Sequence, residues 1–220
     1  MNALSQPSAD RAALSGVSTG VVFVGGTAAA LARSDVPYPR PGSDAPTIRG
    51  FFQDNRPAAR TSAVAQLVSA VTLGRFTASV VQLAGSAGRG SRALQAAAAI
   101  GGATAVTSLA GSGLLTAALT RKDAGSDAET VTLHRRAFLS GGVVHGVGFG
   151  LLVGALGVAG GRTGVLPRGA ATAALASGAA GLLTPLYLLA EPAAWLIPVG
   201  RFSGLVLSGF AGIRLARGQR

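Results

Sequence analysis

Long apolar stretches alternate with short clusters of charged residues along the whole chain. A helix that crosses the roughly 30 Å hydrocarbon core of a bilayer needs about 20 residues. Stretches of this length cover residues 12–32, 61–84, 93–119, 137–159, 169–190 and 194–215. The pattern therefore predicts an all-α fold, a polytopic transmembrane helix bundle of about six spans, as a single membrane domain over residues 1–220.

The first stretch has a second interpretation, because "AAALA" at residues 28–32 resembles the small-residue site that signal peptidase cleaves. A signal peptide has a basic start and an apolar run of about 7 to 15 residues. Here Arg11 is offset by Asp10 and the apolar run is longer. We expect this span to be retained; cleavage would leave five spans.

The longest connection covers residues 33–60. It begins with the proline-rich "DVPYPRPGSDAP", which cannot be helical throughout because proline removes a backbone donor and restricts the residue before it. Phe51 and Phe52 follow among charged residues, a pattern typical of a short amphipathic turn at the membrane surface. An ordinary solvated loop is the other interpretation of this part.

Composition supports the membrane interpretation. Charged residues make up 12% of the chain, about half the usual share of a soluble domain, and the mean hydropathy is +0.47. The net charge of +11 comes mostly from arginines that flank apolar runs, where they meet lipid phosphates, so we do not expect nucleic-acid binding. With no cysteine, the chain has no disulfide, thiolate metal site or thiol catalysis.

The charges give a weak indication of orientation. If the N-terminus is cytoplasmic, eight basic residues lie on the cytoplasmic side and nine on the other side. The positive-inside rule, applied to these counts, therefore hardly distinguishes the two orientations. Of the acidic residues, only Asp10 then lies inside and seven lie outside. We expect both termini to be cytoplasmic.

Small residues recur at every fourth position in two spans. Such stripes let helix backbones approach closely in lipid, where no hydrophobic drive brings helices together. The stripes are Gly142, Gly146, Gly150 and Gly154 in the fourth span, and Gly200, Gly204, Ser208 and Gly212 in the sixth. We expect these two helices to pack against each other or against a partner chain.

Two arginines stand inside apolar spans, each in a Gly-Arg-Phe triplet. Arg75 and Arg201 would lie within roughly 10 Å of one another in depth, at a cost of about 2.5 to 3.5 kcal/mol for each charge. No acidic residue lies within a span. The guanidinium groups would therefore snorkel or bind backbone carbonyls and hydroxyls, or share a cavity and bind an anion, or meet an acid from a partner protein.

Other polar residues extend this candidate site. His145 lies inside the fourth span as a hydrogen-bonding or proton-accepting group, and Gln66 and Gln82 flank Arg75. His134, which stands beside two arginines, is expected at the membrane interface. The two histidines lie eleven residues apart, or about 16 Å along a helix, so they cannot ligate one metal or haem and no cofactor is predicted.

Three segments, "FFQDNRPAAR", "SAVTLGRFTASVV" and "IPVGRFSGLVL", together resemble actinobacterial multi-pass membrane proteins of unknown function. In that family the arginine after Ile-Pro in the last helix is the typical feature, and an arginine at the position of Arg75 is a departure. The resemblance implies a helical bundle in the bacterial inner membrane. It carries no established activity.

No nucleophile elbow, zinc motif or pair of catalytic carboxylates occurs in the chain, so a non-enzymatic role is favoured. The leading hypothesis is a membrane protein that binds or transports a small anionic or amphiphilic molecule, or a lipid, at a cavity lined by Arg75, Arg201, His145, Gln66 and Gln82. The alternative is a structural or regulatory subunit, or a homo-oligomer, whose glycine-rich helix faces dock another membrane protein.

Overall fold

The computed structural model describes residues 6–121 and 125–218. These residues form an all-α helical bundle with no strand among them, and six of the helices are long and apolar enough to cross a membrane. The predicted fold class and the predicted number of spans are confirmed.

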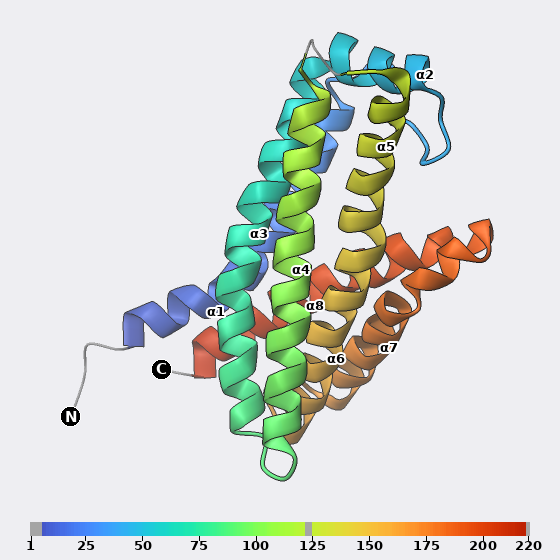
Figure 1. Cartoon of the computed structure of the whole chain (residues 1–220). Helices are drawn as coiled ribbons and strands as arrows, with labels where there is room; N and C mark the ends of the chain where they lie inside the picture. The colour runs from blue at the N-terminus through green and yellow to red at the C-terminus, as the bar shows by residue number, and fades with distance from the viewer. Residues whose placement is uncertain (1–5, 122–124, 219–220) are drawn as a thin grey trace.

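The spans are formed by the α-helices and several short helical turns drawn in Figure 1. The first three spans and the connection after the first contain α1 (Gln6–Leu31), α2 (Ala45–Arg49), the π-helical turn η1 (Gly50–Asp54), α3 (Arg56–Gly85) and α4 (Ser91–Leu119). The last three contain α5 (Asp127–Phe138), the π-helical turn η2 (Leu139–Val144), α6 (His145–Thr163), α7 (Arg168–Leu182), the 3₁₀ turns η3 (Thr184–Leu188) and η4 (Glu191–Trp195), and α8 (Leu196–Gly218).

The six spans form a closed ring in which each contacts two principal neighbours. The order around the ring is α1, α3, α4, α6, α7, α8 and back to α1. Figure 1 shows α3 and α4 side by side over their whole length, with α5 and α6 continuing one another beside α4. The core inside this ring contains Phe76, Leu109, Phe149 and Leu205. Side chains that face inward therefore meet residues from several spans.

Glycine and proline set where the helices end. The turn from α3 to α4 uses Gly88 and Gly90 at φ of +78° and +77°, a left-handed conformation that favours glycine. At the end of α7, Pro185 cannot donate a backbone hydrogen bond, and the chain continues as the turn η3. The fifth span, predicted as one helix over residues 169–190, is thus α-helical only to Leu182.

The glycine stripe of the fourth span lies against α7. A side-chain carbon added at Gly150 would meet the backbone oxygen of Gly178 at 2.6 Å and the backbone nitrogen of Leu182 at 2.8 Å. One added at Gly146 would meet the hydroxyl of Thr184 at 2.7 Å. The small residues let the backbones of α6 and α7 touch, as expected for helix packing in lipid.

The stripe of the sixth span contacts three neighbouring helices. A side-chain carbon added at Gly204 would lie 2.6 Å from the ring of Phe149 in α6. A side-chain carbon added at Gly200 would lie 2.8 Å from the backbone nitrogen of Gly181 in α7. Farther along α8, the carbonyl of Ser208 lies 2.6 Å from the position of such a carbon on Gly16, and Gly212 faces the backbone of Ala13 in α1. Both predicted stripes are covered by helices of the same chain: α7 contacts both, and the fourth and sixth spans also touch each other directly, as predicted.

The connection after α1 folds over one end of the ring. Its residues Ala45–Asp54, hereafter the cap segment, place Phe51 and Phe52 in a small apolar cluster with Ile48 and Leu119. Both rings are buried, at 5% and 0% exposure, respectively. The predicted amphipathic turn exists, but its phenylalanines pack on the protein instead of lying in the membrane surface.

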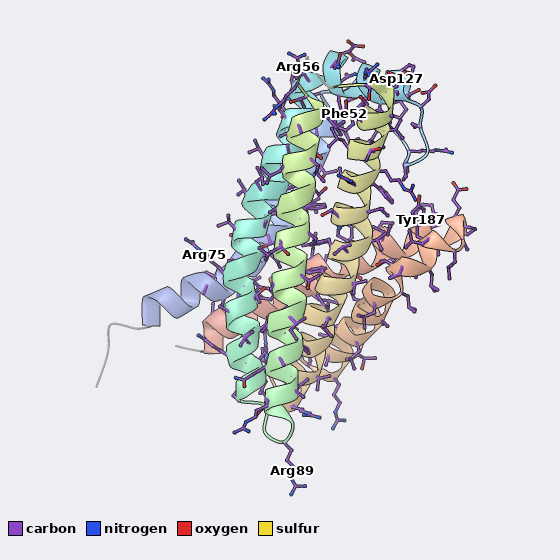
Figure 2. The ribbon with its side chains drawn as sticks, in the orientation of Figure 1. Phe52, Arg56, Arg75, Arg89, Asp127 and Tyr187 are labelled. Atoms are coloured by element: carbon purple, nitrogen blue, oxygen red, sulfur yellow. The ribbon has the colours of Figure 1, made fainter. Side chains whose placement is uncertain are left out.

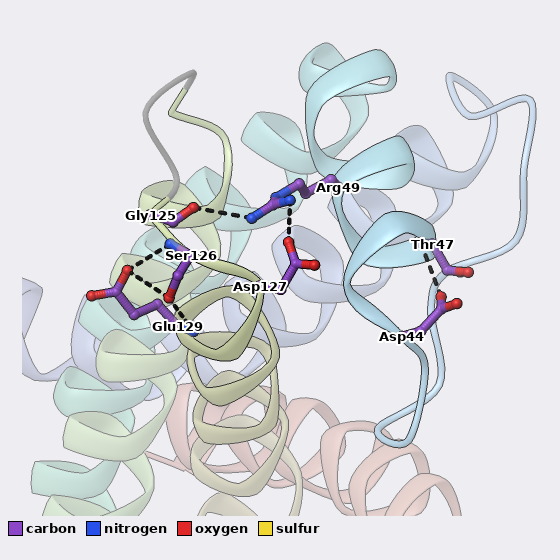
Figure 3. A network of polar contacts seen from close by, with 7 residues as sticks. All are labelled: Asp44, Thr47, Arg49, Gly125, Ser126, Asp127 and Glu129. Carbon is purple, nitrogen blue, oxygen red and sulfur yellow. Dashed lines mark hydrogen bonds and ion pairs between the residues drawn. The ribbon is translucent and has the colours of Figure 1, made fainter.

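Polar contacts hold the cap segment to the start of α5 (Figure 3). Arg49 forms an ion pair with Asp127 and donates a hydrogen bond to the carbonyl of Gly125 at 3.0 Å. Ser126 and Glu129 form a capping box that begins α5. These contacts hold the cap segment over a cavity at this end of the ring, which Phe51 lines.

Candidate functional site

Arg201 is the charged residue of α8 that faces the interior of the ring. Its guanidinium carbon lies 5.1 Å from the centre of the Phe23 ring in α1. One terminal nitrogen donates a hydrogen bond to the backbone carbonyl of Gly141, whereas Nε is buried and has no partner. Among the described residues the single ion pair joins Arg49 and Asp127. No described carboxylate therefore neutralises Arg201.

The carbonyl that receives this hydrogen bond belongs to the π-helical turn Leu139–Val144. A π turn contains an additional residue relative to an α turn and often occurs at functional sites. Ser140 in the same turn donates a hydrogen bond to the carbonyl of Ser108 in α4 at 2.7 Å, which fixes the turn against its neighbour. The hydrogen bond to α4 thus fixes the position of the Gly141 carbonyl that accepts from Arg201.

A cavity of about 260 Å³ lies in front of this arginine. Its walls come from α1, the connection after α1, the cap segment, α3, α4, α5, η2 and α8. The lining residues are Phe23, Thr27, Ala30, Leu31, Tyr38, Phe51, Ala58, Ser62, Gln66, Ser112, Ala137, Phe138, Gly141, Gly142, Ile197 and Arg201. The volume is slightly below the 300 Å³ or so at which typical small-molecule pockets begin.

Two polar atoms in the cavity wall are buried without a partner. Gln66 donates a weak hydrogen bond of 3.4 Å to the hydroxyl of Ser62, but its Oε1 accepts none. The Nε of Arg201 is the second such atom. Buried polar groups are normally hydrogen-bonded, and an unpaired one often marks a site for a ligand or a water molecule. The wall offers one unpaired acceptor and one unpaired donor.

Aromatic residues from the cap segment and its surroundings form one end of this site. Tyr38 and Phe51 line the cavity, with their ring centres 5.1 Å apart. Behind them, the ring of His134 lies 5.9 Å from those of Tyr38 and Phe52. His134 is fully buried and neither ring nitrogen has a hydrogen-bond partner. The histidine predicted at the membrane interface is therefore inside the protein.

His145 lies on the other side of Arg201, in the core of the ring. Its Nδ1 is 3.0 Å from the carbonyl of Ala105, and since a carbonyl only accepts, Nδ1 carries the proton. The imidazole stacks on Phe149 with ring centres 5.5 Å apart. A second cavity of about 10 Å³ lies beside both side chains and is lined by His145, Arg201 and Phe23 among others. It has room for about one water molecule.

Arg75 and Gln82 lie away from these cavities. Both are exposed on the outer face of α3, and Figure 2 shows Arg75 pointing outward. In the triplet of α3 the next residue, Phe76, is fully buried, whereas in that of α8 Arg201 faces inward and Phe202 is 45% exposed. The two similar triplets thus present opposite faces. Of the five predicted residues, Gln66 and Arg201 line the larger cavity, whereas His145 lines only the smaller one beside Arg201.

Several residues of the site are missed by the sequence analysis. Phe23, Ser112 and Phe138 are ordinary members of apolar or small-residue runs, and nothing in their spacing marks them. Gly141 is preceded in sequence by a serine and followed by another glycine, which is compatible with a local departure from α-helix but does not specify it. These residues become visible only when the helices are placed around Arg201.

Comparison of the chain with models of protein families, with curated proteins and with solved structures gives no match. The described residues hold no group of three or more His, Asp or Glu side chains that could bind a metal ion. Functional inference therefore depends on the geometry around Arg201 and on the membrane character of the bundle.

Proposed function

We propose that this protein binds a small anionic molecule with an apolar body in the cavity beside Arg201, and that it does so within the bacterial inner membrane. The observation that supports this proposal most directly is the partly buried guanidinium of Arg201, which faces the interior of the ring. It has a single carbonyl partner, an unpaired Nε and no carboxylate among the described residues. A charge kept at this depth at such cost is a functional-site hypothesis by default.

Arginine is suited to a carboxylate or a phosphate ester. Its planar fork binds two oxygens of such a group at once, and hydrogen bonds between charged groups are stronger than neutral ones. A bound anion would supply the missing counter-charge and accept from Nε. The Nε2 group of Gln66, whose present acceptor is the Ser62 hydroxyl at 3.4 Å, would donate a second hydrogen bond to the anion in the same cavity.

The rest of the cavity favours a short apolar body. Phe23, Phe138 and Ile197 line it together with several alanines. A volume of about 260 Å³ suits a molecule such as a medium-chain carboxylate and is too small for a complete phospholipid. Binding or passage of such a molecule, without chemical change, is the activity we propose.

We further propose that the end of the bundle with the α3–α4 loop faces the cytoplasm. At this end Asp10, near the start of α1, is the one acidic residue of the described ranges, and six arginines of the later helices and loops lie here. They are Arg89, Arg92, Arg162, Arg168, Arg214 and Arg217. Figure 2 shows Arg89 at this end and Arg56 and Asp127 at the other, where acidic residues accompany the basic ones. The two ends carry similar numbers of basic residues, so this proposal rests on the acidic residues, most of which lie at the other end.

This orientation can be tested directly, because the chain has no cysteine of its own. A single cysteine at Ser86 or at Ser43 would be treated with a membrane-impermeant maleimide in cells with a permeabilised outer barrier but an intact inner membrane. Labelling at Ser43→Cys and protection at Ser86→Cys is the expected result. The reverse pattern would invert the proposed topology.

The binding proposal is tested with octanoate and purified protein in a neutral detergent. A ligand that binds only the folded state raises the melting temperature by mass action. We expect octanoate to stabilise the wild type, octanol to do so less, and Arg201→Gln to abolish the difference. Arg75→Gln is the matched control, because Arg75 lies outside the cavity.

A second variant distinguishes loss of the binding site from a folding defect in Arg201→Gln. Ser62 lines the same cavity, and Ser62→Phe would fill it while leaving the arginine in place. Loss of the octanoate effect in both Arg201→Gln and Ser62→Phe, with cooperative melting, would support the site. Equal octanoate stabilisation in all variants would refute it.

A further inference from the structure

A second and larger hollow lies on the side of the bundle below the cap segment. It has a volume of about 1370 Å³ and is formed by the connection after α1, by α5 with the start of η2, and by the η3–η4 turn. This turn projects sideways from the bundle because Pro185 and Pro192 replace regular α-helix by 3₁₀ turns (Figure 1). We call this hollow the lateral groove.

The charges of the lateral groove are unpaired. Arg40 lines it from the connection after α1, and Arg135 lines it from α5. Neither guanidinium has a hydrogen-bond or ion-pair partner among the residues that the structure describes. Glu191 is the one acidic side chain in the lining, so the groove carries an excess of positive charge. An anionic group would be attracted to it.

The groove also has the features of the membrane interface. Tyr187 and Trp195 line it, and tyrosine and tryptophan concentrate at the level of lipid headgroups. Trp195 is 75% exposed, and Leu189 beside the groove is 85% exposed, which places apolar surface around an opening rich in arginine. Such a surface fits a molecule with a charged head and apolar chains.

We propose that the lateral groove binds one anionic phospholipid, with its phosphate held by Arg40 and Arg135 and its acyl chains against the apolar wall near Phe138. Arginine pairs are well suited to phosphate oxygens. The groove is about five times larger than the cavity at Arg201, which suits a lipid. The two sites use different arginines and share Phe138 as a common wall, so this inference does not depend on the proposed function.

Trp195 provides a direct reporter because it is the single tryptophan of the chain. The protein would be reconstituted in bilayers that mix phosphatidylglycerol and phosphatidylcholine, with brominated acyl chains on one lipid at a time. Bromine quenches tryptophan fluorescence at close range. We expect brominated phosphatidylglycerol to quench Trp195 well beyond its share of the bilayer, and brominated phosphatidylcholine to quench it less than its share.

The variants Arg40→Gln and Arg135→Gln should lower the apparent affinity for phosphatidylglycerol by about tenfold each, the scale expected for a lost charge-assisted contact. Arg136→Gln is the matched control, since Arg136 is the exposed neighbour of Arg135 on α5 and does not line the groove. Native mass spectrometry of the same proteins would count retained lipid. Quenching that follows bulk lipid composition, or an Arg136→Gln effect equal to that of Arg135→Gln, would overturn the proposal.

Discussion

Arg201 and Gly141 are joined by a hydrogen bond between the sixth span and the π-helical turn of the fourth. The guanidinium is held by this carbonyl and by the ring of Phe23. Its Nε is buried and has no hydrogen-bond partner. The contact explains how a charge is tolerated inside the ring without an acidic partner among the described residues. The carbonyl does not neutralise the charge of Arg201, so the effect of this charge on stability can be measured by removing it.

Replacement of Arg201 by methionine should separate binding from stability. The substitution removes a partly buried charge that no described carboxylate neutralises, so the ligand-free protein should be within about 1 kcal/mol of the wild type in stability, or more stable. Thermal melting without added anion is the measurement. A loss of 3 kcal/mol or more, the size seen when a needed buried polar partner is removed, would instead make Arg201 a structural tie between α8 and the π turn.

Two glycines of one stripe should respond differently to alanine. In Gly150→Ala the new carbon would press on backbone atoms of α7 and should destabilise the protein by about 1 to 3 kcal/mol. At Gly154 the space within 4 Å is free, so Gly154→Ala should be neutral or stabilising by up to about 1 kcal/mol. Urea or thermal unfolding in detergent would compare them. Equal effects would contradict the observed contact of α6 with α7.

The opposite facing of the two Gly-Arg-Phe triplets predicts unequal phenylalanine effects. Phe76 is fully buried in the core, so Phe76→Ala should cost about 3 to 5 kcal/mol. Phe202 is 45% exposed on the outside of α8, so Phe202→Ala should cost less than about 1 kcal/mol in a membrane or micelle. The melting temperatures of both variants would show which substitution destabilises the protein more. A reversed order would mean that α3 or α8 is rotated.

The cap segment should respond to acid through Asp44. This exposed carboxylate begins α2, and a hydrogen bond from Thr47 holds its pKa below its usual value. Because the folded-state pKa is lowered, the carboxylate stabilises the turn above its unfolded pKa of about 3.9 and the contribution is lost as the pH falls through the folded value. Hydrogen exchange of Thr47 and Ile48, corrected for intrinsic rates, should therefore speed up below about pH 4.

The variant Asp44→Asn is the control for this effect, because asparagine caps a helix and does not titrate. Its exchange at Thr47 and Ile48 should be independent of pH over the same range. If the wild type shows no greater acid sensitivity than Asp44→Asn, the carboxylate does not stabilise this turn.

The sequence was sufficient to predict the number and class of the spans, because an apolar run of about twenty residues is stable in a bilayer as a membrane-spanning α-helix. It also marked the close-packed faces of the fourth and sixth spans. It did not identify α7 as the neighbour that both faces meet, because glycine spacing describes one helix and says nothing of its partner.

The candidate site was predictable only in part. Arg75 and Arg201 have nearly identical sequence surroundings, and the spans are apolar on every side, so the local pattern does not say which arginine faces inward. Tertiary contacts determine which arginine faces inward. In α3, Phe76 fills the core and Arg75 faces outward. In α8, small residues bring the helix close to α7, and Arg201 faces Phe23. The π turn that supplies Gly141 leaves no clear signal in composition.

The additional residue in the π turn Leu139–Val144 has a consequence for the whole fourth span. Each residue of an α-helix advances the side chains by about 100° around the axis, so the extra residue sets the phase between α5 above it and α6 below it. Removing one residue here would keep the span long enough for the bilayer but would rotate Gly146 and Gly150 away from α7. In this segment the residue count itself is a structural determinant, and the span tolerates substitution more readily than a single-residue deletion.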